Sequence, residues 1–157
     1  MTTVSIIPTV AAQLKTLLEA EATADLLGGG AVPVYDAWPA SVSPSDYIVL
    51  GDCEDGMHTY PVMKAARKKR EERYYQMVHF VTHRPGLSAT DAKAAALALF
   101  NYLEDEIADD PAIGLGATEP TLRLLIERFE LRCTTETTYM GWRCQINAYV
   151  LVNCRLG

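Results

Sequence analysis

The chain has 157 residues, of which 49% are hydrophobic and 22% are charged, and its net charge is −6. This size and composition predict one globular domain spanning 1–157 and exclude a disordered chain. The longest apolar runs fall far short of the roughly 20 residues of a membrane helix. The start, MTTVSIIPTV, has no basic residue before its apolar stretch, so it does not resemble a signal peptide. We therefore expect a cytoplasmic location and no contact with membranes.

The charges are segregated along the chain. One base and eight acids give residues 1–63 a net charge of −7, and six acids without a base give residues 102–119 a charge of −6. Between them, six bases and two acids give residues 64–73, KAARKKREER, a charge of +4. The overall acidity argues against a dedicated nucleic-acid-binding protein. The basic run has three interpretations: a solvated surface, a contact with an acidic patch on another copy or a partner, and a contact with nucleic-acid phosphates.

The N-terminal part predicts a helix followed by two short strands. The helix is expected over 9–27, after Pro8 and before the glycines at 28–30. Its apolar stripe consists of Val10, Leu14, Leu17, Leu18 and Leu26. The strands are expected at 31–38 and 46–54, on either side of a turn rich in Pro and Ser.

The middle of the chain predicts a central strand and a long helix. Residues 55–72 are predicted as a loop or a loosely paired extension, because a charged run fits poorly into a core. In the strand expected over 73–84 both alternating sets of side chains are apolar, which is typical of a central strand. Ser88 begins a capping-box-like sequence, SATD, and an Ala-rich amphipathic helix is expected to run from there to Asp109.

Two long strands, 120–135 and 141–155, follow and are joined by a Thr-rich turn. In the second, most even-numbered residues are apolar whereas Arg143, Gln145 and Asn147 are polar, and this period of two is typical of a strand. We expect four even-numbered residues to pack beneath the helices: Trp142, Ile146, Val150 and Val152. Strands longer than the usual five or six residues favour a sheet that continues toward a neighbouring subunit.

The order of the elements predicts the fold class. A helix, three strands, a second helix and two further strands indicate an α+β fold. The expected architecture is a two-layer sandwich, with a mostly antiparallel mixed sheet and two helices packed on one face.

No group of residues has the spacing of a catalytic or metal site. His79 and His83 would lie about 13 Å apart on a strand, too far for one zinc ion, and are interpreted as a half-buried and a rim histidine. The glycines at 28–30 follow a helix instead of preceding one, so they predict a helix end and not a phosphate loop. The acids at 52–55 lack the spacing of a calcium loop. We predict no catalytic, cofactor-binding or metal-binding residues and no enzymatic activity.

The four cysteines are predicted to be reduced and mostly buried; they are Cys53, Cys133, Cys144 and Cys154. Cys144 and Cys154 are ten residues apart on one expected strand, or roughly 33 Å, so they cannot bridge each other. A disulfide elsewhere is the alternative interpretation.

Segments along nearly the whole chain resemble the tail terminator (tail completion) proteins of long-tailed bacteriophages. The matching segments are the helix with LKTLLEAE, the stretch VYDAWPASVSPSDYIVLGD, the charged region before RYYQMVHFV, the helix ATDAKAAALALFNYLED and the strand GWRCQINAYVLVNCR. Members of that family are small proteins with two helices and a mixed sheet, and they close the top of the tail tube as a hexameric ring.

The resemblance implies a structural protein of the virion that assembles in the host cytoplasm as a homo-hexamer and lies at the tail–neck junction. One face of the ring would bind the tail-tube protein and end its polymerisation, and the other would receive the head-completion or connector protein. DNA would pass through the lumen without sequence recognition.

A ring of this kind predicts charge-complementary contacts between neighbouring copies. The candidate interface residues are Arg67, Lys68, Lys69 and Arg70 on one copy, and Glu104, Asp105 and Asp109 on the next. Two other hypotheses remain: a head–tail connector of related fold, and a ferredoxin-like regulatory or RNA-binding module, which the acidity disfavours.

Overall fold

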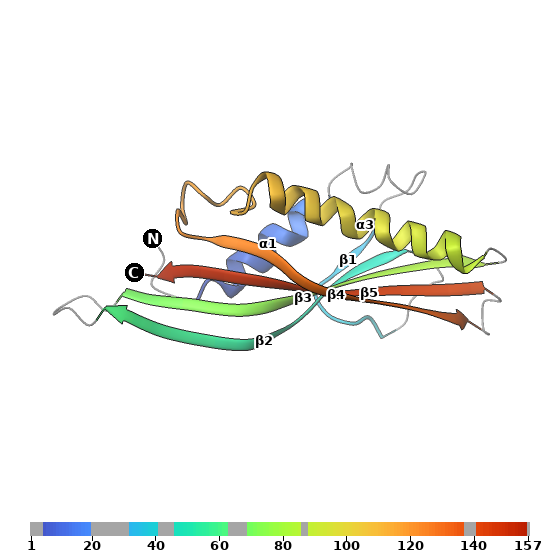
Figure 1. Ribbon diagram of the computed structural model, residues 1–157, viewed down its shortest axis with the longest axis horizontal. Coiled ribbons are helices and arrows are strands. Elements are labelled where there is room, and N and C mark those ends of the chain that lie inside the picture. Colours follow the sequence, from blue (N-terminus) through green and yellow to red (C-terminus); the bar gives the residue numbers. More distant parts are fainter. Residues whose placement is uncertain are drawn as a thin grey trace.

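A computed structural model of the chain describes residues 5–19, 32–40, 46–62, 69–85, 88–136 and 141–156. It has two layers, a five-stranded sheet and two helices. Both helices contribute to the same core cluster and therefore lie on the same face of the sheet (Figure 1). The predicted α+β two-layer sandwich is confirmed.

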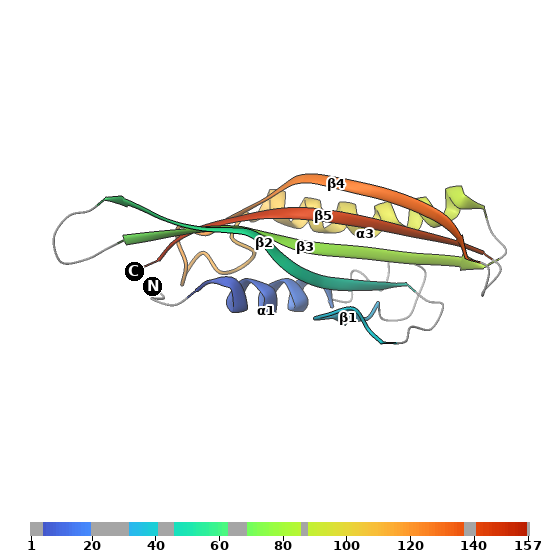
Figure 2. The ribbon, with the colours of Figure 1, turned by 90° about the horizontal axis from the view of Figure 1, so that it is seen from below.

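The sheet is long and mostly antiparallel. Its strands are β1 (Val34–Tyr35), β2 (Tyr47–Val62), β3 (Lys69–Pro85), β4 (Arg123–Glu136) and β5 (Gly141–Leu156). They are ordered β1-β2-β3-β5-β4, and the β1–β2 pair is parallel while the other three pairs are antiparallel. Figure 2 shows β3 and β5 running along most of the molecule. The strand apolar on both faces, β3, is central as predicted, and β4 forms an edge.

The first helix, α1 (Ile7–Leu18), is shorter than the predicted 9–27. It begins one residue before Pro8, which is tolerated because amides in the first turn of a helix need no intrahelical partner. Its last turn is closed by the amide of Glu19, which donates to the carbonyl of Lys15. Three members of the predicted stripe are fully buried, namely Val10, Leu14 and Leu18. Leu26 and the glycines at 28–30 lie outside the described residues.

The second helix, α3 (Ala89–Asp109), agrees with its prediction. Ser88 is the N-cap, and its Oγ accepts a hydrogen bond of 3.4 Å from the amide of Asp91. Residues such as Ala96, Leu99 and Leu103 face the sheet and are fully buried. The helix packs across β3, β4 and β5.

Two strand predictions need correction. The expected strand at 31–38 is reduced to two residues, because the chain after Tyr35 turns so that the Trp38 ring reaches the ring of His79. The loop interpretation of 55–72 is wrong, since β2 continues to Val62 and β3 begins at Lys69. The two strands pair through backbone hydrogen bonds with three register shifts. The irregular pairing agrees with the alternative prediction of a loosely paired extension.

The parity predicted for the last strand is confirmed. In β5 every even-numbered residue from Cys144 to Leu156 is buried against the core. Trp142 is half-buried and packs against the same cluster. The odd-numbered residues of β3 and β5 point to the opposite face of the sheet, on which neither of the described helices packs. One histidine prediction is wrong, because His83 is buried where a rim position was expected; His79 is half-buried as predicted.

Candidate functional site

The side of the sheet opposite the helices, called the helix-free face below, concentrates arginine side chains. Strand alternation and cross-strand pairing bring six of them to this face from β3, β4 and β5. They are Arg73, Arg123, Arg128, Arg132, Arg143 and Arg155. Five are exposed and Arg143 is half-buried.

A bulge in β4 makes this grouping possible. The pairing register shifts between Ile126 and Arg128, so one strand residue is left over. After the shift Arg128 lies opposite Tyr149, on the same face as Arg123, although the two arginines differ in parity. The sequence analysis missed this surface because alternation counted straight along β4 places them on opposite faces.

Glutamates also lie on the helix-free face but are fewer. They are Glu54, Glu71, Glu127 and Glu130. Six arginines therefore outnumber the four glutamates on this face, in a protein whose net charge is −6. The helix-free face is therefore the basic side of an acidic protein.

One end of the helix-free face is sealed by aromatic side chains. The ring of Trp38 lies 4.8 Å from the ring of His79, and the ring of Tyr35 packs edge-on at 6.0 Å from that of Tyr47. Beneath this cover Val49 and Val81 are almost completely buried. The apolar residues of β2 and β3 that face away from the helices thus form a second, smaller core.

Hydrogen bonds fix the polar residues at the border of the sealed end. Asn147 Oδ1 accepts from His79 Nδ1 at 2.6 Å and from Gln145 Nε2 at 2.8 Å. Gly51 leaves room for the imidazole, since a Cβ at this position would lie 2.6 Å from His79 Nε2. Arg143 donates to the hydroxyl of Tyr47 at 3.3 Å. These partners make the border rigid and hold one arginine in place.

The other end of the helix-free face is open. The guanidinium of Arg128 lies 3.9 Å from the centre of the Tyr149 ring, a cation–π contact, and Tyr149 meets Tyr75 edge to face at 6.4 Å. A hydrogen bond with Glu127 raises the pKa of Tyr75, so its hydroxyl stays protonated. Leu125 is 59% exposed in the same area. Arginine and tyrosine side chains are enriched at the centre of protein–protein interfaces.

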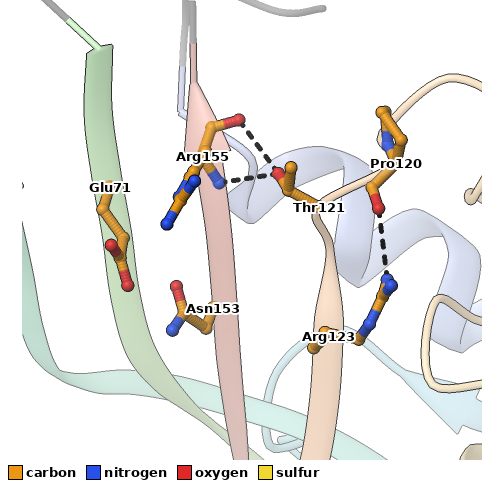
Figure 3. A pocket seen from close by; sticks show the side chains of 6 residues that line it. All are labelled: Glu71, Pro120, Thr121, Arg123, Asn153 and Arg155. Carbon is orange, nitrogen blue, oxygen red and sulfur yellow. Dashed lines mark hydrogen bonds between the residues drawn. The ribbon is translucent and has the colours of Figure 1, made fainter.

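A shallow pocket of about 320 Å³ lies at this open end (Figure 3). Its lining consists of Glu71, Pro120, Thr121, Arg123, Asn153 and Arg155. Thr121 Oγ1 accepts from the amide of Arg155 at 2.9 Å and donates to its carbonyl at 3.3 Å, which fastens the start of β4 to β5. Because the lining comes from β3, β4, β5 and the segment just before β4, the pocket is part of the helix-free face and not a separate enclosed site.

The opposite side of the molecule is acidic. The predicted interface acids Glu104, Asp105 and Asp109 are exposed on α3, whose buried residues face the sheet. No basic residue lies in the last turn of this helix. Carboxylates near a helix C-terminus interact unfavourably with the helix dipole, by about 0.3–1 kcal/mol each. This acidic cluster therefore lowers the stability of the isolated helix.

The basic half of the predicted interface is described only in part. Arg67 and Lys68 lie outside the described residues. Lys69 and Arg70 begin β3, where they pair with Val62 and Leu156. The start of β3 lies toward the same end of the molecule as the acidic end of α3 (Figure 1). From there β3 leads directly to the exposed Arg73, so the basic run continues into the helix-free face.

Within the described ranges no three His, Cys, Asp or Glu side chains gather as a metal site. Neither of the helices that the structure describes is long and apolar enough to cross a membrane.

Comparisons with known proteins found similarity in fold but none in sequence family. No protein-family model matches the sequence, and no curated protein sequence does. Among solved structures, a chain from the virion of a native gene transfer agent (GTA) particle is similar, with a TM-score of 0.50 and 19% sequence identity. The match covers 91% of this chain and 93% of that chain. At this identity the similarity establishes a shared fold.

Proposed function

We propose that this protein is a structural component of a phage-like virion that acts by assembly and not by catalysis. The observation that carries the proposal is the fold shared with a virion chain over more than nine-tenths of both molecules. The open helix-free face supports it, because its exposed leucine, tyrosines and arginines suit a protein partner.

The specific role that we propose is that of a tail terminator, a hexameric ring that caps the tail tube and ends its polymerisation. One ring face would then bind the tail-tube protein and the other the head-completion protein, at the tail–neck junction of the virion. DNA would pass through the lumen without being recognised by sequence. The segment resemblance and the shared fold both support this role.

The distribution of charge suggests how copies meet. The basic helix-free face and the acidic surface of α3 lie on opposite sides of the sheet, so one copy can offer its basic side to the acidic side of the next. Such a contact is head-to-tail, and head-to-tail contacts close into rings when the rotation per subunit allows it.

We assign the two surfaces of this contact as follows. Glu104, Asp105 and Asp109 form the acidic side. The basic side consists of the run Arg67, Lys68, Lys69 and Arg70 and of the arginines that follow it on the helix-free face, beginning with Arg73. Complementary charges of this kind steer association and fix register more than they add affinity.

Negative-stain electron microscopy of the purified protein, alone and mixed with tail-tube protein, tests the proposal. We expect rings with about sixfold symmetry that sit on tube ends and stop tube growth. Arg128→Glu should weaken ring formation, whereas Lys15→Glu, with the same change of charge on the helix side, should leave it intact. A monomer that leaves tube growth unchanged would contradict the role. In a parallel mixture with portal protein, binding to the portal ring would favour the connector hypothesis.

A further inference from the structure

We propose that Cys133 and Cys144 form a reversible disulfide that staples the edge strand β4 to β5. The two residues are direct cross-strand partners in the antiparallel pair. Their sulfur atoms lie 2.6 Å apart, with the Cys144 thiol directed at the sulfur of Cys133. Directly opposite residues of antiparallel strands have Cα atoms about 4.5–5.5 Å apart, which is within the range that a disulfide spans.

The pairing is selective, because the remaining two cysteines have other neighbours. Cys53 is exposed on β2, and its thiol donates to Gln76 at 3.3 Å. Cys154 lies ten residues from Cys144 on the same strand and contacts Thr121 and Glu119. Oxidation of the folded chain should therefore join Cys133 to Cys144 and form no other disulfide within the chain.

The two partners differ in their access to an oxidant. Cys133 is half-buried at the edge of the sheet, 3.9 Å from the carbonyl of Ala89 at the start of α3. Cys144 is fully buried, and burial together with the thiol of Cys133 raises its pKa to about 12. The thiolate is the reacting form, so the accessible Cys133 reacts first and the buried Cys144 second.

The oxidant can be any small-molecule disulfide, written RSSR. The thiolate of Cys133 attacks one sulfur of RSSR, which forms a mixed disulfide on Cys133 and releases one RS⁻. Cys144 then loses its proton and attacks the Cys133 sulfur, which forms the Cys133–Cys144 bond and releases a second RS⁻. Both leaving groups take up the protons from the protein thiols, so the protein loses two electrons and RSSR becomes two RSH.

The staple would act on the surface proposed for assembly. Strand β4 has β5 as its one partner in the sheet and supplies three arginines of the helix-free face. A covalent link at Cys133 fixes the register of β4 close to Arg132 and Arg128. If the protein is a virion component, it leaves a reducing cytoplasm on release and the disulfide would form then. This timing rests on the proposed function, whereas the disulfide itself does not.

The test is oxidation of the purified full-length protein with glutathione disulfide, followed by intact-mass measurement and peptide mapping after alkylation of free thiols. We expect one crosslink, between the peptides of Cys133 and Cys144, which lowers the mass by about 2 Da, and no crosslink at Cys154 or at the exposed Cys53, whose glutathione adduct adds to the mass separately. The oxidised protein should unfold at a temperature higher by roughly 5 °C and return to the original value after reduction.

Variants separate this outcome from accidental oxidation. Cys133→Ser and Cys144→Ala should abolish both the mass loss and the thermal shift, and Cys53→Ser should retain both. Because the main result is measured on the unaltered protein, a variant that fails to fold does not affect it. A stable glutathione adduct on Cys133 without the crosslink, a crosslink to another cysteine, or an unchanged mass would each overturn the proposal.

Discussion

The two faces of the sheet show how one strand can serve two purposes. On the helix side, alternate residues of β5 such as Ile146 and Val150 are completely buried. On the helix-free side, their neighbours include Asn147 and Tyr149, which take part in hydrogen bonds and a cation–π contact. Burial of apolar area makes the first set the main source of stability. The second set is exposed or half-exposed and is available to a partner.

A second contrast lies within the helix-free face. Its sealed end has its own aromatic cover and a closed hydrogen-bond network around Asn147. Its open end has exposed arginines and an exposed leucine, and none of the described residues covers them in this way. The molecule therefore completes one end by itself, and we expect the other end to be completed by another molecule.

The largest expected effect comes from the helix side. Ile146→Ala should lower the free energy of unfolding by about 2–5 kcal/mol, because it removes a completely buried side chain and leaves a cavity. Asn147→Ala, one residue away on the other face, should cost about 1 kcal/mol for its lost hydrogen bonds. Urea unfolding measures both values. Equal losses would show that the two faces contribute alike to stability.

The next effect concerns the buried carboxylate that joins β3 to α1. Glu72 accepts hydrogen bonds from Ser5 Oγ at 2.6 Å and from the amide of Ile6 at 3.1 Å, at the positive end of the α1 dipole. Glu72→Ala should cost about 2–3 kcal/mol, because hydrogen bonds to a charged group are lost. The matched control is Glu71→Ala, on the helix-free face, which should cost less than 1 kcal/mol. Thermal unfolding of the two variants measures the difference. Equal melting temperatures would refute the claim that Glu72 stabilises the start of α1.

A smaller effect with the opposite sign is expected at Tyr74. Its side chain is completely buried on the helix side, and its hydroxyl has no hydrogen-bond partner among the residues that the structure describes. Tyr74→Phe should therefore be neutral or stabilise the protein by about 1 kcal/mol, since it removes an unsatisfied buried group. A clear loss of stability in chemical denaturation would mean that the hydroxyl has a partner in solution.

The same residue predicts a pH dependence. Burial raises the pKa of Tyr74 above its ordinary value of 10.0, and that of Cys144 from 9.0 to about 12. Above pH 9 the unfolded chain loses these protons while the folded chain keeps them, so stability falls as the pH rises. Each group contributes up to about 1.4 kcal/mol per pH unit. Denaturation from pH 7 to 11 should show this fall, with a shallower slope above pH 10 in Tyr74→Phe. An unchanged slope would exclude Tyr74 as a cause.

The smallest effect on stability belongs to the open end. Arg128→Ala removes the contact with Tyr149 and should cost at most about 1 kcal/mol, because the arginine is exposed. Its effect on self-association should be larger, since exposed arginines beside tyrosines often dominate interfaces. Analytical ultracentrifugation alongside thermal unfolding separates the two readouts. A variant that self-associates as the parent protein does would remove Arg128 from the proposed contact.

The fold could be predicted where local pattern decides the structure. The cap at Ser88, the apolar stripe of α3 and the alternation of β5 depend on neighbours along the chain, and all three are confirmed. The extension of β2 to Val62 was predicted only as an alternative to a loop, because its polar side chains give no alternating pattern and its hydrogen bonds go to β3. The alternation of side chains likewise did not predict the bulge before Arg128, because a register shift depends on the partner strand.

The sequence predicted the acids of α3 and the basic run before β3 as interface candidates, but it did not predict the arginines of the helix-free face. The acids of α3 form a visible run in the sequence, and the structure places Glu104 and Asp109 on an exposed side. The arginines of β3, β4 and β5 are spread over 83 positions, from Arg73 to Arg155. Only the pairing of the three strands brings them to one face.

The most direct test of the central claim uses two variants with reversed charge. One replaces Arg73, Arg123 and Arg128 by Glu, and the other replaces Glu104, Asp105 and Asp109 by Lys. Each variant alone has the same sign of charge on both surfaces of the head-to-tail contact, so neighbouring copies repel each other. Both variants should therefore be folded monomers in sedimentation velocity experiments. An equimolar mixture should form closed assemblies in which native mass spectrometry finds the two variants in equal number. Variants that each assemble as the parent does, or a mixture that stays monomeric although both variants are folded, would contradict the claim.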